Sequence, residues 1–335
     1  MSCDSMKDLF NKLSGFFQAP QTRSSRKDFL RGIAASLGAA PLVKAVASAA
    51  RTSTEKKLEP RNKRIVRTSC DLAVVKGNSP AAITIRAVEA LGGMGMFVRR
   101  GDVVVVKPNI GWDRGPEYAA NTNPQVVATL IKLCYAAGAK KVKVFDRSCN
   151  TAAMCYVNSG IADAARKAGA DLYHVIDSKF IPARFPAGSA LESWPIYSDA
   201  VECDCFINVP IAKHHGLSGL TLSMKNLMGV CGGSRGQIHW DIDKKLPELT
   251  KFINPDLTVI DAYRILLRNG PSGGNLRDVK TMKTIIAGTD PVLADSYAAT
   301  LFDKNPKDIG HIRMGETLQV GTTNIAKAKI KKITI

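Results

Sequence analysis

The densest group of chemically active side chains lies in residues 208–233, directly after an apolar run. This stretch contains the adjacent histidines His214 and His215, the lysines Lys213 and Lys225, and a series of glycines. Lysine ammonium groups bind phosphate or carboxylate as point charges, and histidines ligate metals or carry protons near neutral pH. Glycines let backbone amides approach an anion closely. The stretch therefore predicts a site for an anionic ligand or a metal-containing cofactor, with a glycine-rich structural crossover as the alternative.

Three side chains of this stretch are the expected catalytic groups. We expect Lys213 and Lys225 to bind anionic groups and His214 to ligate a metal or transfer protons. Neighbouring residues on a strand point to opposite sides, so only one of His214 and His215 is expected to face the site. The other residues expected to bind the ligand are Lys107, Asn109, Asn226 and Gly229. The candidate metal ligands are His214, His215, Asp290, Asp295 and Cys231.

Two further histidines have different expected roles. His239, close to Asp241 and Asp243 in the chain, is a candidate second ligand or proton carrier. His174 is expected in the middle of a strand, where a core position is the better explanation.

Polar residues also follow the predicted strands at their carboxyl ends. In open α/β sheets, ligands bind beyond these ends, so one shared cleft is expected. The alternative is that polar residues occur there simply because strands end. The residues concerned are Lys107 and Asn109 after 102–106, Asp146 after 141–145, Lys213 to His215 after 205–209, Asp261 after 257–260, and Asp290 after 283–287.

The elements that must position these side chains alternate between strands and helices. Asn123 is suited to cap a helix that opens with Pro124. The alternation predicts an α/β fold with a mainly parallel sheet and helices on both faces, in a single large domain over residues 65–335. Residues 178–199 are expected to be irregular, and residues 326–335 to form an edge strand.

The N-terminal residues 1–49 have the order expected of an export signal that is removed from the mature protein. Residues 25–31 (SRKDFLR) resemble the twin-arginine pattern, with Lys27 in place of the second arginine. An alanine-rich stretch follows, and Ala47-Ser48-Ala49 offers a cleavage site. Residues 50–64 are expected to be a solvated basic linker. We therefore expect an exported, periplasmic or otherwise extracytoplasmic protein with the export machinery as a partner; an amphipathic helix on the folded domain is the alternative.

Charge and hydropathy exclude several classes of protein. The formal net charge is +18, but part of it lies in the expected signal and linker, and the rest is spread without interleaved aromatics. Nucleic-acid binding is therefore not expected. No apolar run reaches the roughly 18 to 20 residues of a membrane helix, so no stable span is expected in the mature chain. The chain also lacks P-loop, G-x-S-x-G and H-E-x-x-H motifs, which argues against a common kinase or hydrolase.

The eight cysteines leave two interpretations open. No C-x-x-C pair occurs, so neither a zinc ribbon nor a ferredoxin cluster is indicated. Cys203 and Cys205 have the spacing of residues on one face of a strand. Together with Cys231 they are candidates for a dispersed metal or iron–sulfur centre. Buried hydrophobic thiols are the favoured alternative.

Several of these motifs together resemble the family known as domain of unknown function 362. The resemblance covers roughly residues 65–320 and implies a site built from the motifs. Members of that family are often associated with iron–sulfur clusters, and some carry an added ferredoxin domain that this chain lacks. Relatives with twin-arginine signals occur. The matching segments are Val106-Lys107-Pro108-Asn109, Thr122-Asn123-Pro124, residues 208–214 (NVPIAKH), residues 224–229 (MKNLMG) and residues 287–295 (AGTDPVLAD).

A more distant similarity is to the nickel-dependent lactate racemase family. It shares the order of a strand, an anion-contacting loop, a proline-opened helix, and a later histidine and lysine in a glycine-rich segment. This is an analogy of fold and site position, which does not by itself imply racemisation.

These observations predict an exported α/β protein that binds a small anionic ligand or a metal-containing cofactor at the strand ends, for redox or proton-transfer chemistry. A metal or an iron–sulfur centre is the cofactor that the histidine and cysteine candidates allow. One alternative is a non-catalytic module that binds a ligand or metal and delivers it to an exported enzyme. The other is an iron–sulfur electron carrier. Catalytic turnover distinguishes the enzyme from the binding module.

Overall fold

The computed structural model describes residues 56–335, in which ten strands form one sheet. The expected export signal lies outside the described residues, as does the first part of the expected linker. β8 (Ile211–His215) pairs with β10, and β9 (Gly219–Thr221) pairs with β8. The other strands lie in the order β12 (Ile330–Thr334), β1 (Leu72–Lys76), β11 (Val279–Gly288), β10 (Leu257–Leu266), β7 (Cys205–Val209), β2 (Val103–Pro108), β3 (Lys141–Val144) and β4 (Asp171–Leu172).

The sheet is mainly parallel, as the alternation of strands and helices predicts. β10, β7, β2, β3 and β4 pair in parallel, and β12 is parallel to β1. β11 runs antiparallel to both of its neighbours, β1 and β10. The carboxyl ends of β2, β3 and β7 therefore meet at one edge of the sheet, where ligands bind in open α/β folds.

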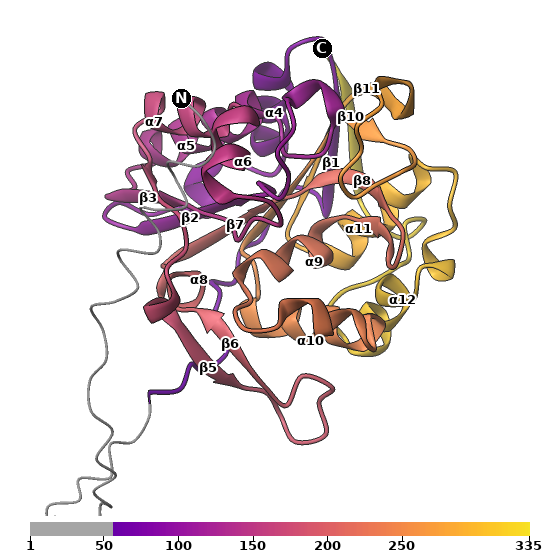
Figure 1. Ribbon diagram of the computed structural model, residues 1–335. Helices are drawn as coiled ribbons and strands as arrows, with labels where there is room; N and C mark the ends of the chain where they lie inside the picture. Colours follow the sequence, from indigo (N-terminus) through magenta and orange to yellow (C-terminus); the bar gives the residue numbers. More distant parts are fainter. Residues whose placement is uncertain (1–55) are drawn as a thin grey trace, which may run out of the picture. The chain divides into compact units, whose positions relative to one another are not determined.

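Helices cover both faces of the sheet, which explains why its strands are apolar without alternation. In β2, Val104 and Val106 pack into one buried cluster and Val105 into the other. Figure 1 shows one group of helices on each side of the sheet. The first group is α4 (Pro80–Ala90), α5 (Pro124–Ala136), α6 (Ala152–Asn158) and α7 (Ile161–Lys167). The second is α9 (Ser223–Asn226), α10 (Ile242–Ile253), α11 (Pro291–Thr300) and α12 (Gly310–Thr317).

Local sequence signals explain the ends of several elements. The side chain of Asn123 accepts a hydrogen bond from the backbone N–H of Gln125, and Pro124 is the first residue of α5, so the predicted cap is confirmed. Residues 330–334 form the predicted strand at the sheet edge. The expected strand around His174 is shorter than predicted, since β4 ends at Leu172. His174 lies beyond it at an exposed position, so the expected core position is wrong.

The expectation of irregular structure over residues 178–199 is wrong. This region contains an antiparallel hairpin of β5 (Phe180–Arg184) and β6 (Ser193–Tyr197), followed by the short helix α8 (Asp199–Glu202). Ala183 and Ile196 are fully buried in the core cluster that also contains the α10 side chains. The hairpin forms because its inward-facing side chains have this apolar surface to cover.

The expected basic linker is partly packed onto the fold. Leu58 bridges to Ala183, and Arg61 is only 4% exposed. The Arg61 guanidinium forms an ion pair of 2.5 Å with Asp256 and donates further hydrogen bonds to backbone carbonyls. Residues 56–64, the described part of the expected linker, accordingly belong to the compact unit that spans Lys56–Ile335. The charge pattern of the linker does not reveal this pairing, because Asp256 lies far from Arg61 in the sequence.

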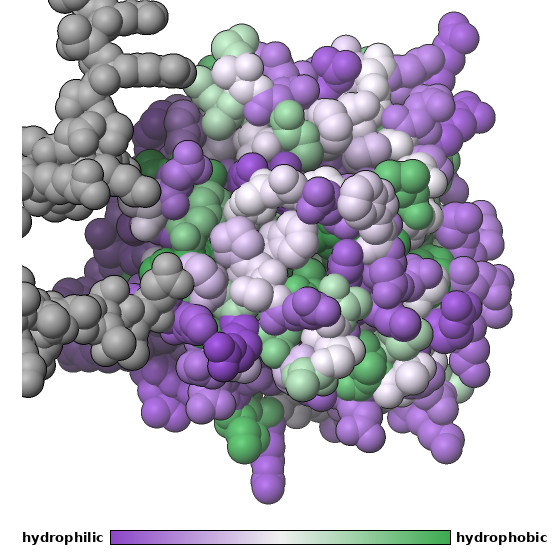
Figure 2. All heavy atoms as spheres, turned by 60° about the horizontal axis from the view of Figure 1, so that its bottom comes forward, coloured by the Kyte–Doolittle hydropathy of each residue, from purple (hydrophilic) through white to green (hydrophobic). Residues whose placement is uncertain are grey.

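The surface of the described part carries a few exposed large hydrophobic residues, among them Ile65, Val157, Leu217 and Trp240. Among residues 56–335, no helix combines the length and the apolar character needed to span a bilayer. Figure 2 shows a face that is mainly hydrophilic, with hydrophobic side chains in scattered groups.

Candidate functional site

A cavity of about 910 Å³ lies beyond the carboxyl ends of β2 and β3 and beside β8. Its wall is formed by the loops that follow β2 and β3, by β8 and α9, and by the loop over residues 228–240. The charged residues in this wall are Asp146, Arg147, Lys213, Lys225 and Arg235. The histidines in the wall are His215 and His239. The expected cleft at the strand ends is therefore present.

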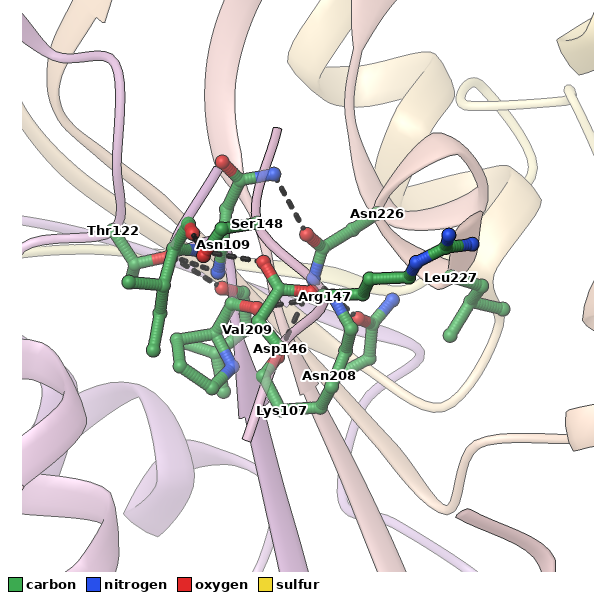
Figure 3. Close-up of polar contacts among 12 residues, drawn as sticks. Lys107, Asn109, Thr122, Asp146, Arg147, Ser148, Asn208, Val209, Asn226 and Leu227 are labelled. Carbon is green, nitrogen blue, oxygen red and sulfur yellow. Dashed lines mark hydrogen bonds and ion pairs between the residues drawn. The ribbon is translucent and has the colours of Figure 1, made fainter. Parts of the chain in front are cut away.

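A buried ion pair supports one side of the cavity. The Lys107 Nζ lies 2.8 Å from the Asp146 Oδ1, and both side chains are almost completely shielded from solvent. Figure 3 shows this pair among the polar side chains at the strand ends. Lys107 does not line the cavity. It therefore supports the wall from behind, and its charge is matched by Asp146. This position differs from the expected one, in which Lys107 binds the ligand directly.

Gly229 is part of the same arrangement. A Cβ at this position would overlap the carboxylate of Asp146 and would lie 2.5 Å from the Lys107 Nζ. Only a glycine fits where the loop passes so close to the ion pair. Gly229 does line the cavity, and its carbonyl accepts a hydrogen bond from the backbone N–H of Arg147.

A chain of asparagines connects the strand ends to Lys213. The Lys213 Nζ donates to the Asn109 Oδ1 at 3.1 Å and to the Ala120 carbonyl. The Asn109 amide donates to Asn226 at 3.0 Å, and the Asn226 amide donates to Asn208 at 2.8 Å. Figure 3 shows the Asn109–Asn226 contact directly. Since Asn109 and Asn226 line the cavity, their positions match the predicted binding role.

The two lysines of the cavity wall have lowered pKa values. Burial lowers the pKa of Lys213 to about 7, and the charge of Lys225 adds to this effect. Burial also lowers the pKa of Lys225 to about 8, and the charge of Arg235 lowers it further. Both amines therefore change protonation state near neutral pH, as proton-transfer groups must.

The histidine that faces the cavity is His215, not His214. Side chains alternate along β8, so Lys213 and His215 lie on the cavity side and His214 on the other. The His214 Nδ1 accepts a hydrogen bond from the backbone N–H of Gly270. The expected catalytic and metal-binding role of His214 therefore does not fit its position. The position does fit the expectation that only one of the two histidines faces the site.

Hydrogen bonds set the tautomers of the two histidines in the wall. The His215 Nδ1 accepts from the backbone N–H groups of Leu217 and Ser218, which leaves its Nε2 to carry the proton. The His239 Nδ1 lies 2.9 Å from the Gly236 carbonyl, so this nitrogen carries the proton and Nε2 is an acceptor. The rings stack at 5.5 Å. Burial lowers the pKa of His215 to about 3, so its ring is neutral at physiological pH.

Two arginines in the wall were missed by the sequence interpretation. The Arg235 guanidinium donates to the carbonyls of Arg147 and Ser148, and the Arg147 guanidinium donates to those of Cys231 and Gly233. Neither forms an ion pair with a carboxylate within the described part of the chain. A signal was present for Arg147, which directly follows Asp146 at a strand end.

Asp290 and Asp295 have structural partners and do not line the cavity. Asp290 caps α11 by accepting from the backbone N–H groups of Val292 and Leu293. Asp295 is completely buried and accepts from the backbone N–H groups at the start of α9, Ser223 and Met224. Asp295 therefore positions the short helix that carries Lys225, instead of binding a metal.

Among the described residues, the donor atoms needed for a metal or iron–sulfur centre do not come together. Within residues 56–335, no three of His, Cys, Asp and Glu are grouped so that they could hold a metal ion. Cys231 is fully buried outside the cavity wall, and Cys203 and Cys205 lie in different buried clusters because Cys203 precedes the strand. The exposed thiol among the described cysteines is Cys149. The predicted ligand set does not fit such a centre.

Comparison with known proteins identifies proteins that are similar to this chain. The family model "Domain of unknown function (DUF362)" matches residues 104–300. The Thylakoid-associated protein sll1697 of Synechocystis sp. is 28% identical over 246 residues, which are 70% of this chain and 74% of that protein. The structure of the lactate racemase apoprotein from Thermoanaerobacterium thermosaccharolyticum has a TM-score of 0.40 and 12% identity. That match covers 78% of this chain and 62% of the racemase, less than two thirds of its length.

Proposed function

The chain belongs to the DUF362 family, and we propose that it binds a small anionic ligand in the cavity and transfers a proton to or from it. The observation that carries this proposal is the charge of the wall. Four cationic side chains face one carboxylate, that of Asp146, and Lys107 already neutralises this carboxylate. A carboxylate or phosphate group is the ligand that such a surface attracts.

The volume of the cavity supports a ligand of metabolite size. Pockets for small molecules are usually about 300 to 1,000 Å³ and carry a few convergent polar groups. Lys213 and Lys225 provide positive charge, and the His215 Nε2–H provides a neutral hydrogen-bond donor. These groups bind and orient the anion without a metal ligand set.

Lys213 is the proposed proton carrier. Its Nζ is held by Asn109 and the Ala120 carbonyl, so the amine has a fixed position in the wall. With its pKa lowered to about 7, it both donates and accepts a proton at physiological pH. An ordinary lysine, with a pKa near about 10.4, would be a poor base under these conditions.

Deuterium exchange distinguishes an enzyme from a binding module. We would incubate the protein with small carboxylic acids in heavy water and follow the C–H signals next to the carboxyl group by NMR. The proposal expects exchange that is lost in Lys213→Met, while Lys167→Met, in an exposed helix position, retains it. If these acids bind without any exchange, the protein is better explained as a non-catalytic module that binds and delivers a ligand.

Export is a separate proposal and is supported by the sequence of residues 1–49 alone. The expected mature chain begins directly after Ala49. N-terminal sequencing of protein recovered from outside the cytoplasm tests this expectation. Protein that retains Met1 and stays in the cytoplasm would contradict it.

A further inference from the structure

We propose that Lys225 is a nucleophile that forms an imine with the carbonyl carbon of a small 2-oxo acid bound in the cavity. The proposal rests on the anion-binding function proposed above and names its substrate class. It also assigns the two cavity lysines different tasks, covalent attachment for Lys225 and proton transfer for Lys213.

Lys225 differs from the other buried lysines of the site because its amine has no partner among the described residues. Three lysines of the site region are at least nine-tenths buried: Lys107, Lys213 and Lys225. Lys107 pairs with Asp146, and Lys213 donates to Asn109 and the Ala120 carbonyl. The Lys225 Nζ has neither a hydrogen bond nor an ion pair with any residue that the structure describes. A buried amine without a partner, in the wall of a cavity, is placed to react with what enters the cavity.

The surroundings of Lys225 favour the neutral form of its amine. An ammonium group has no lone pair, so a lysine nucleophile must lose its proton near neutral pH. Burial lowers the pKa of Lys225 to about 8, and the neighbouring charges of Arg235 and Lys107 act in the same direction. A desolvated lysine next to other cations is the environment that activates amines for imine formation.

The backbone that carries Lys225 is held on both sides of this residue by hydrogen bonds. α9 is a short helix whose first N–H groups, those of Ser223 and Met224, are bound by the buried Asp295 carboxylate. The Asn226 side chain that follows Lys225 is tied to Asn109 and Asn208. The amine is thus presented from a fixed backbone, which reactive groups need for correct orientation.

The surrounding groups fit a 2-oxo acid because it combines a carboxylate with an adjacent electrophilic carbonyl. The carboxylate would be attracted by the guanidinium groups of Arg147 and Arg235, which lack carboxylate partners among residues 56–335. The carbonyl carbon would then be within the part of the cavity that Lys225 lines. A simple carboxylic acid would bind to the same cations without reacting.

The proposed step balances without any added oxidant or metal. The lone pair of the neutral Lys225 Nζ attacks the carbonyl carbon and a C–N bond forms, while the carbonyl π electrons move to oxygen and take up a proton from the Lys213 ammonium. The hydroxyl group of this carbinolamine takes up a second proton, derived from the attacking nitrogen, and leaves as water. The products are the protonated C=N imine, one water molecule and neutral Lys213.

The imine explains why a proton acceptor lies in the same wall. A protonated imine withdraws electrons from the neighbouring carbon and makes its C–H bond acidic. The His239 Nε2 has a free lone pair because Nδ1 faces the Gly236 carbonyl. Neutral Lys213 and His239 are therefore the two bases available for this proton.

Reductive trapping tests the proposal. We would treat the folded protein with pyruvate, 2-oxoglutarate or phenylpyruvate in the presence of cyanoborohydride, and then measure the intact mass and map the modified peptide. A single adduct on Lys225 is expected with at least one of these acids. Lys225→Arg, which keeps the positive charge, should lose the adduct, and the exposed-site variant Lys167→Arg should retain it.

Oxalate separates the failure of this proposal from that of the anion-binding function, because it carries carboxylates but no ketone. Oxalate should bind to the wild-type protein and to Lys225→Arg, and it should protect the wild type from modification. Oxalate binding without a Lys225 adduct from any of the three acids would overturn the imine and leave anion binding intact. An adduct on Lys213 would overturn the assigned division of tasks. Absence of both oxalate binding and adduct would contradict the two proposals together.

Discussion

Gly229 lies against Asp146 so closely that a Cβ at position 229 would overlap the carboxylate. The contact links the loop that carries the cavity wall to the ion pair between Asp146 and Lys107. Loop and ion pair are therefore one packed unit, and the shape of the cavity depends on both.

Replacing Gly229 by alanine tests this unit. We expect Gly229→Ala to lower the free energy of unfolding by about 1 to 3 kcal/mol, because the buried pair must shift to accommodate the methyl group. Gly236→Ala is the matched control, since a Cβ there meets nothing within 4 Å, and it should stay within about 0.5 kcal/mol of wild type. Urea unfolding measures both. Equal stability of the two variants would contradict the packing described for Gly229.

The lowered lysine pKa values predict that anion affinity falls as pH rises through about 7 to 8. The cause is that Lys213 and then Lys225 lose their charge in this range. Ordinary lysines would keep affinity constant to about pH 9 or above. Titration calorimetry with oxalate at several pH values measures the change, and an affinity that is constant over this range would contradict the lowered pKa values.

The same pKa values predict the sign of the change in stability. In the unfolded chain Lys213 keeps an ordinary pKa, so above about pH 7 the unfolded state binds more protons than the folded state, and the unfolding free energy of the ligand-free protein rises with pH. Below this pH, the folded protein is destabilised by the full cost of burying the charged Lys213 ammonium group. One such group contributes at most about 1.4 kcal/mol per pH unit. We would measure the unfolding free energies of wild type and Lys213→Met by urea unfolding at several pH values. Plotted against pH, the two should differ in slope by this contribution between about pH 7 and 8.5; identical slopes would refute it.

The two adjacent histidines offer a matched pair of variants. His215→Ala removes the Nε2–H donor from the cavity wall, and we expect oxalate affinity to drop roughly 10- to 100-fold, as for loss of a hydrogen bond to a charged group. His214→Ala should leave affinity near the wild-type value, because His214 lies on the opposite side of β8. Calorimetry on folded variants measures both. The reverse ranking would restore the sequence-based choice of His214.

The start of the folded unit is testable through Arg61. Arg61→Met leaves the buried Asp256 carboxylate without its partner, and we expect a loss of about 3 to 5 kcal/mol in unfolding free energy. Arg67→Met, at an exposed position, should change it by less than about 0.5 kcal/mol. A chain that starts at residue 65 should be destabilised in the same way as Arg61→Met. An unchanged melting temperature for that shorter chain would support a solvated linker.

The fold and the place of the site could be predicted because both depend on local patterns. Apolar runs followed by polar residues mark the carboxyl ends of β2, β3 and β7, and Asn123 with Pro124 marks the start of α5. These signals require no knowledge of distant contacts. They predicted the mainly parallel sheet, the cleft at the strand ends, and six of the side chains or glycines in its wall: Asn109, Lys213, His215, Lys225, Asn226 and Gly229.

The remaining site residues depend on long-range contacts. Which side chains of β8 face the cavity depends on the pairing of β8 with β10, where Ile211 lies opposite Asp261. The sequence alone does not show which side of the strand faces the cavity. Arg235 is held by the carbonyls of Arg147 and Ser148, almost 90 residues earlier in the chain. Asp295 resembled a metal ligand in sequence, but its burial against α9 gives it a structural role.

Binding of a small anion by the cationic cavity wall is tested by comparing the affinity for oxalate of wild type with that of the double variant Lys213→Ala/Lys225→Ala. The measurement is titration calorimetry at about pH 6.5, where the lysines are mostly charged. We expect measurable binding to the wild type, no binding of neutral oxamide, and loss of at least about 100-fold in the double variant. Lys167→Ala should bind like wild type. Equal affinity of wild type and double variant for oxalate would contradict the claim.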